Sequence, residues 1–154
     1  MDNIRAAEIL IKSLDLTSLN HDDTPETITD LCQRASTKYG NAAAVCIYPE
    51  YIPVALAEAP KGVKIATVVN FPDGGNNIKA VEKEINKAIK LGADEIDAVL
   101  PYKDLLAGNV ALCQDFLKMF RLANADKTLK IIIESGELKS TSMIKKAAQL
   151  CIDA

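Results

Sequence analysis

Short, mostly apolar segments that stop at a proline constrain the fold of this chain more than any other feature. Pro49, Pro72 and Pro101 each follow such a segment directly. Proline has no backbone N–H and cannot donate to a sheet ladder, so each of these prolines marks the end of a strand. Two further segments have strand-like patterns without the proline. The predicted strands are residues 14–19, 43–48, 64–71, 95–100 and 129–134.

Segments with helical periodicity separate these strands. Asp23 and Glu26 have capping-box spacing at the start of one of them, and Pro25 suits the first turn of the same helix. Gly92 is a natural residue for the position after a helix, because it reaches positive φ without a Cβ clash. The predicted helices are residues 3–11, 23–40, 51–59, a long helix opened by 73–77 and ended by Gly92, 109–124 and 140–154, with a loop or short turn over 102–108.

Strands that alternate with helices predict βαβ units and a parallel sheet. Right-handed crossovers leave two architectures, an open doubly wound sheet or part of a (β/α)₈ TIM barrel. The five predicted strands fit an open sheet and fall short of a barrel, which takes about 250 residues. No linker or low-complexity segment interrupts the 154 residues, so we expect a single unit over residues 1–154.

Composition excludes several classes of partner. The net charge is −3 without a basic run, which argues against nucleic acid and against anionic membranes as partners. No apolar run approaches the roughly 20 residues that a membrane span needs. The start of the sequence lacks the basic and apolar regions of a signal peptide. We therefore expect a cytoplasmic protein without nucleic-acid or membrane partners.

The cysteines and the single histidine do not suggest a metal site. The four cysteines are widely spaced, form no CxxC pair and lie among apolar residues, so reduced, packed side chains are expected. His21 is the only histidine and lies in a polar segment. The sequence therefore predicts no metal site. The cysteines are Cys32, Cys46, Cys113 and Cys151.

An aspartate in the middle of an apolar strand is the main candidate for chemistry. Asp97 lies between Ile96 and Ala98, and an ionised carboxylate in such a place needs a partner. Two interpretations stay open here. Asp97 is either a structural residue satisfied by a backbone or lysine neighbour, or an acid or base that faces a cavity.

A lysine in the last predicted strand is a possible partner for this aspartate. If Asp97 and Lys130 turn to the same side, adjacent strands bring their charges close together. Such a buried pair is weak evidence for stability, because desolvation can outweigh the attraction, and better evidence for a site. The alternative is that Lys130 begins its strand and extends to solvent.

Five motifs, in order along nearly the whole chain, resemble the class I deoxyribose-phosphate aldolases. They are Asp15-Leu16-Thr17, Ala44-Val45-Cys46-Ile47-Tyr48-Pro49, Thr67-Val68-Val69-Asn70-Phe71-Pro72, Gly92-Ala93-Asp94-Glu95-Ile96-Asp97 and Lys130-Ile131-Ile132-Ile133-Glu134-Ser135-Gly136-Glu137-Leu138.

The resemblance implies a TIM (β/α)₈ barrel, here incomplete with about five strands. It implies reversible cleavage of a phosphosugar, 2-deoxyribose 5-phosphate, to glyceraldehyde 3-phosphate and acetaldehyde through a Schiff base, without metal or cofactor. Asp97 falls on the family's proton-relaying aspartate. Asp15, Cys46 and Lys130 fall on positions that line the same pocket.

The resemblance also shows a departure. The family's Schiff-base lysine and phosphate loops follow on later strands, and none of the lysines here matches them. We therefore expect the 154 residues alone to be inactive. The alternative function is a non-catalytic, truncated barrel fragment that self-associates, because its first and last strands would be open edges. A homo-oligomer is expected in either case.

Overall fold

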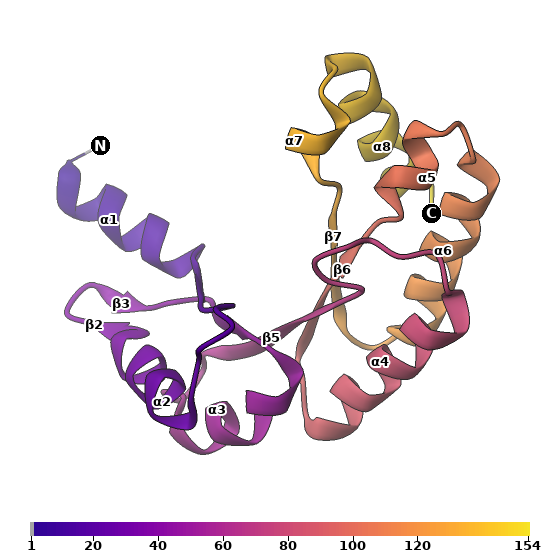
Figure 1. Cartoon of the computed structure of the whole chain (residues 1–154). Coiled ribbons are helices and arrows are strands. Elements are labelled where there is room, and N and C mark those ends of the chain that lie inside the picture. Colours follow the sequence, from indigo (N-terminus) through magenta and orange to yellow (C-terminus); the bar gives the residue numbers. More distant parts are fainter. Residues whose placement is uncertain (1) are drawn as a thin grey trace. The chain divides into compact units, whose positions relative to one another are not determined.

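The computed structural model describes residues 2–154 and contains one five-stranded sheet and one short hairpin (Figure 1). The strand order of the sheet is β1-β4-β5-β6-β7, so β1 and β7 are its two end strands. Strand β4 pairs in parallel with both β1 and β5. The expectation of an α/β chain with a parallel sheet is therefore confirmed. No helix within the described residues is long and apolar enough to cross a membrane.

The chain forms two compact units, which are described separately. The first unit runs to Thr67 and includes Ala88–Glu95, and the second consists of Val68–Lys87 and Ile96–Ala154. The prediction of a single unit over residues 1–154 stays a prediction, and Met1 lies outside the described residues.

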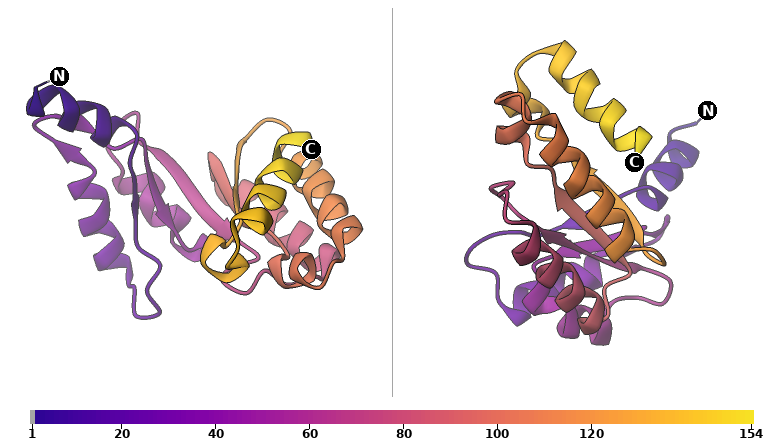
Figure 2. Two further views of the ribbon diagram at one scale, coloured as in Figure 1. Left: turned by 90° about the horizontal axis from the view of Figure 1, so that it is seen from above. Right: turned by 90° about the vertical axis from the view of Figure 1, so that its right-hand side faces the viewer.

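The first unit is built around β4, in which all four residues are buried. Helix α2 packs against α3, and α1 lies against β3 of the hairpin (Figure 2). Helix α1 itself buries none of its residues. The elements of this unit are α1 (Asn3–Lys12), β1 (Asp15–Thr17), α2 (Pro25–Arg34), β2 (Ser36–Thr37), β3 (Gly40–Asn41), β4 (Ala44–Ile47), the 3₁₀ helix η1 (Pro49–Tyr51), α3 (Ile52–Glu58) and most of β5 (Lys64–Val69).

Two expectations for the first unit are wrong. The capping box of α2 is formed by Thr24 and Thr27, and Asp23 instead accepts hydrogen bonds from Ser18 and Asn20 in the preceding loop. Helix α2 ends at Arg34, before Gly40, because the chain turns into the β2–β3 hairpin. Each strand of this hairpin has only two residues, too few for an alternating pattern to predict it.

The second unit has its core between β6 and the helices that follow it. Phe116 and Phe120 are fully buried, with their rings edge to face at a centroid distance of 5.7 Å. Its elements are the end of β5, most of α4 (Ile78–Leu91), most of β6 (Glu95–Val99), α5 (Tyr102–Leu106), α6 (Val110–Ala123), β7 (Thr128–Ile132), α7 (Ser135–Leu138) and α8 (Thr141–Asp153).

Two short helices of the second unit were not expected. The segment predicted as a loop or short turn contains helix α5, which buries Tyr102 and Leu105. Strand β7 ends at Ile132, and α7 begins at Ser135 after Glu134 adopts a left-handed backbone conformation with φ 53°. Both helices are too short for a periodic pattern to distinguish them from turns.

Gly74 lies where there is no room for a side chain. Its φ is +59°, and a Cβ on it would lie 2.6 Å from the Leu100 carbonyl oxygen and 2.8 Å from the Tyr102 ring. Both contacts are far inside van der Waals distance, so any larger residue forces the loop away from the end of β6.

We predict that Gly74→Ala destabilises the chain more than Gly108→Ala. Gly108 also has positive φ, at +86°, but a Cβ there meets nothing within 4 Å. The control variant should cost about 1–2 kcal/mol for the backbone conformation alone, and Gly74→Ala about 1–3 kcal/mol more for the clash. Urea unfolding measures both, and equal losses would contradict the close approach seen at Gly74.

Candidate functional site

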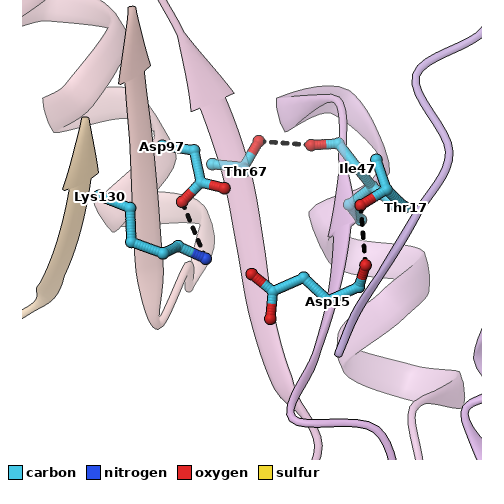
Figure 3. Close-up of polar contacts among 6 residues, drawn as sticks. All are labelled: Asp15, Thr17, Ile47, Thr67, Asp97 and Lys130. Atoms are coloured by element: carbon cyan, nitrogen blue, oxygen red, sulfur yellow. Dashed lines mark hydrogen bonds and ion pairs between the residues drawn. The ribbon is translucent and has the colours of Figure 1, made fainter. Parts of the chain in front are cut away.

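An ion pair between neighbouring strands is the central feature of the candidate site. Lys130 Nζ on β7 lies 3.0 Å from Asp97 Oδ1 on β6 (Figure 3). The side chain of Asp97 is 15% exposed and that of Lys130 is 36% exposed. The expectation that the two residues turn to the same side is therefore confirmed, whereas the alternative in which Lys130 only extends to solvent is not.

The local sequence explains why the aspartate lies where it does. Ile96 and Ala98 are fully buried on one face of β6, which leaves Asp97 on the other face. The Leu100 amide donates to the Ile132 carbonyl over 3.0 Å and fixes the end of β6 to β7. Asp97 lies two residues before Val99, and Lys130 lies two residues before Ile132. The charged pair therefore lies at the same separation from this hydrogen bond on both strands.

The paired charges can do more than hold two strands together. A carboxylate that is only partly exposed keeps its charge when a cation lies at hydrogen-bond distance. Such a carboxylate can accept a proton from a bound molecule and return it. An ammonium group held beside a carboxylate stays protonated, which makes it a poor nucleophile.

The other two predicted site residues lie together in the first unit. Thr17 on β1 and Cys46 on β4 are partners in the parallel register, and Asp15 lies two residues before Thr17 on the same face. Cys46 is 3% exposed, whereas Asp15 is half-buried. The Thr17 hydroxyl donates to the Asp15 carbonyl over 3.0 Å, and the Thr67 hydroxyl donates to the Ile47 carbonyl over 2.7 Å (Figure 3).

Burial makes the other cysteines poor nucleophiles. Burial raises the pKa of Cys32, Cys113 and Cys151 above its ordinary value, and Asp104 adds to the effect at Cys113. A raised pKa lowers the fraction of reactive thiolate at neutral pH. Among the residues that the structure describes, no group of three or more His, Cys, Asp and Glu side chains could hold a metal ion.

Comparison with known proteins gives the family. A model of the DeoC/LacD family aldolases matches residues 9–154. The chain belongs to this family. Its five-stranded parallel sheet corresponds to part of the TIM barrel of the aldolases that it resembles.

Solved structures support the same assignment. A protein assigned as a deoxyribose-phosphate aldolase from Coccidioides immitis is 28% identical, with a TM-score of 0.86 over 94% of this chain and 56% of that one. An aldolase called QR15 is 26% identical, with a TM-score of 0.83 over 92% of this chain and 62% of that one. The tetrameric deoxyribose phosphate aldolase from Aeropyrum pernix is 25% identical, with a TM-score of 0.76 over 94% and 61%. The chain spans about 60% of the length of these structures.

We predict that the Asp97–Lys130 pair is energetically coupled. Lys130→Met should cost about 1–3 kcal/mol, because it leaves a largely buried carboxylate without its cation, and the exposure of Lys130 keeps the loss below that of a fully buried pair. A double-mutant cycle with Asp97→Asn should give a coupling of about 0.5–2 kcal/mol in urea unfolding.

The Lys103–Asp73 pair provides the control for this cycle. Its charged atoms are 3.8 Å apart and its side chains are 60% and 86% exposed. Its coupling should be at most about 0.5 kcal/mol. A coupling for Asp97–Lys130 that is no larger than this would contradict the ion pair.

Proposed function

We propose that this chain forms part of the active site of a deoxyribose-phosphate aldolase. The reaction is the reversible cleavage of 2-deoxyribose 5-phosphate to glyceraldehyde 3-phosphate and acetaldehyde through a Schiff base. The observation that carries the proposal is the Asp97–Lys130 ion pair, 3.0 Å long, on neighbouring strands of a chain from the DeoC/LacD aldolase family. The 28% identity to a protein assigned to this activity supports the choice of substrate.

In the proposed reaction Asp97 moves protons. When the amine adds to the substrate aldehyde, the carboxylate takes a proton from the nitrogen and returns it to the carbinolamine hydroxyl, which leaves as water. When the C2–C3 bond then breaks, the carboxylate takes the proton of the C3 hydroxyl, which becomes the aldehyde of glyceraldehyde 3-phosphate, and gives it to the enamine carbon. Lys130 keeps this carboxylate charged before the reaction and fixes its orientation.

Lys130 does not capture the substrate carbonyl in this proposal. The amine of a Schiff base must lose its proton before it attacks, and a carboxylate 3.0 Å away opposes this loss. We propose that the reactive lysine and the phosphate-binding groups are those that the family resemblance places on later strands, and we expect the 154 residues alone to be inactive.

Asp15 and Cys46 form the proposed wall of the substrate pocket. Asp15 and Thr17 lie on one face of β1, and Thr17 is the register partner of Cys46 on β4, which gives a small polar patch beside a buried thiol. Hydroxyl groups of a sugar phosphate could bind such a patch through hydrogen bonds.

We also propose a cytoplasmic homo-oligomer. The tetramer of the related Aeropyrum pernix aldolase supports association between copies. Strand β7 supports it independently, because this apolar end strand has no fully buried residue, whereas all four residues of β4 are buried. The same exposure favours the alternative function, a non-catalytic fragment that self-associates.

The test of the proposed role is Asp97→Asn in a version completed with the part of the Coccidioides immitis protein that this chain does not cover. Asparagine keeps the shape of aspartate but cannot carry a proton, so kcat should fall at least about 100-fold. Release of glyceraldehyde 3-phosphate in a coupled assay measures the rate. Asp115→Asn, at an exposed position on α6, is the matched control and should keep its rate. Near-normal turnover in Asp97→Asn would make Asp97 a structural residue.

A further inference from the structure

Asn70 occupies an unusual backbone conformation directly after β5. Its φ is +56°, in the left-handed region that residues other than glycine rarely adopt. Asparagine tolerates this region better than most residues, but the conformation still has an energetic cost. The surrounding hydrogen bonds explain how it persists. The Asn70 amide donates to Glu84 Oε2 on α4 over 2.8 Å, and the Asn70 carbonyl accepts from the Gly74 amide over 2.9 Å.

The side chain of Asn70 connects two segments that are far apart in sequence. Its Nδ2 donates to the Gly75 carbonyl over 2.9 Å and to the Val99 carbonyl over 2.9 Å. Both hydrogens of the amide group are therefore used. One bond closes the loop over residues 70–77, and the other fixes this loop to the end of β6.

The bond to Val99 acts on a peptide group that is also held from its other side. The Val99 carbonyl and the Leu100 amide belong to the same peptide plane. The carbonyl accepts from Asn70, and the amide donates to the Ile132 carbonyl of β7 over 3.0 Å. Because a peptide group is planar, fixing its oxygen also fixes its N–H. Asn70 thus orients the donor that joins β6 to β7.

We propose that Asn70 is a positioning residue for the Asp97–Lys130 pair. Asp97 lies two residues before Val99, and Lys130 lies two residues before Ile132. The hydrogen bond between Leu100 and Ile132 sets how far the two strands are shifted relative to each other at this end. Asn70 therefore determines, through one peptide group, whether carboxylate and ammonium meet at 3.0 Å. A role of Asn70 in catalysis rests on the proposed function, whereas its structural effect on the ion pair does not.

The test uses the full chain with Asn70→Gly. Glycine adopts positive φ without cost, so this variant removes the side-chain amide and leaves the backbone conformation accessible. Asn70→Asp is a second variant that keeps the size of the side chain and replaces the donor by an oxygen. The matched control is Asn76→Gly in the same loop, whose amide donates to Asp104 Oδ2 over 3.2 Å and not to β6.

Two measurements separate positioning from general stabilisation. Hydrogen exchange of the Leu100 amide should become at least about tenfold faster in Asn70→Gly and Asn70→Asp, while amides of β4 in the first unit keep their rates. The coupling between Asp97 and Lys130, measured by a double-mutant cycle in the Asn70→Gly background, should fall at least about twofold when expressed as an equilibrium ratio. Asn76→Gly should change neither quantity.

Two results would overturn the proposal. Unchanged exchange at Leu100 and unchanged coupling would show that Asn70 does not set the geometry of the pair. A uniform acceleration of exchange in all strands would show that Asn70 contributes only to overall stability. Neither measurement uses aldolase activity, so loss of the proposed function would leave the result for Asn70 intact, and a negative result for Asn70 would leave the proposed function open to its own test.

Discussion

A carboxylate that is largely withdrawn from water must be compensated, and this requirement organises the second unit. Asp97 is 15% exposed in an apolar strand, where an isolated charge would cost several kcal/mol. The stabilisation that an exposed ion pair provides is smaller than this cost. Lys130 supplies the compensation from the next strand. The two strands must then keep one register, since a shift by one residue would turn either side chain to the opposite face.

The register depends on backbone groups more than on the charges themselves. The Leu100–Ile132 hydrogen bond joins the strands, Asn70 holds the same peptide group, and Gly74 lets the loop approach the Leu100 carbonyl. These contacts come from residues that contribute no charge to the pair. A proton-transferring group benefits from such rigidity, because its rate depends on the distance over which the proton moves.

Much of this arrangement could be predicted from the sequence, and the failures have physical reasons. The prolines after β4, β5 and β6 mark strand ends by removing a donor, so the alternating pattern predicts the parallel sheet. Asp97 was recognisable because an aspartate is rare between buried aliphatic residues. Asn70 could be recognised in the sequence only as part of the motif that ends at Pro72, since its left-handed conformation and its bond to Val99 leave no trace in periodicity. Glu84 was missed, because it lies on the polar face of α4 and looks like any solvated residue there.

The central claim is that Lys130 is the charge partner of Asp97 and not the amine that captures the substrate. The most direct test is to incubate the 154-residue chain with 2-deoxyribose 5-phosphate and borohydride and to determine its mass. Borohydride reduces a Schiff base to a stable adduct on the lysine that formed it. The ion pair predicts an unchanged mass, because the Lys130 ammonium keeps its proton. A mass increase of one reduced adduct that maps to Lys130 would contradict the claim.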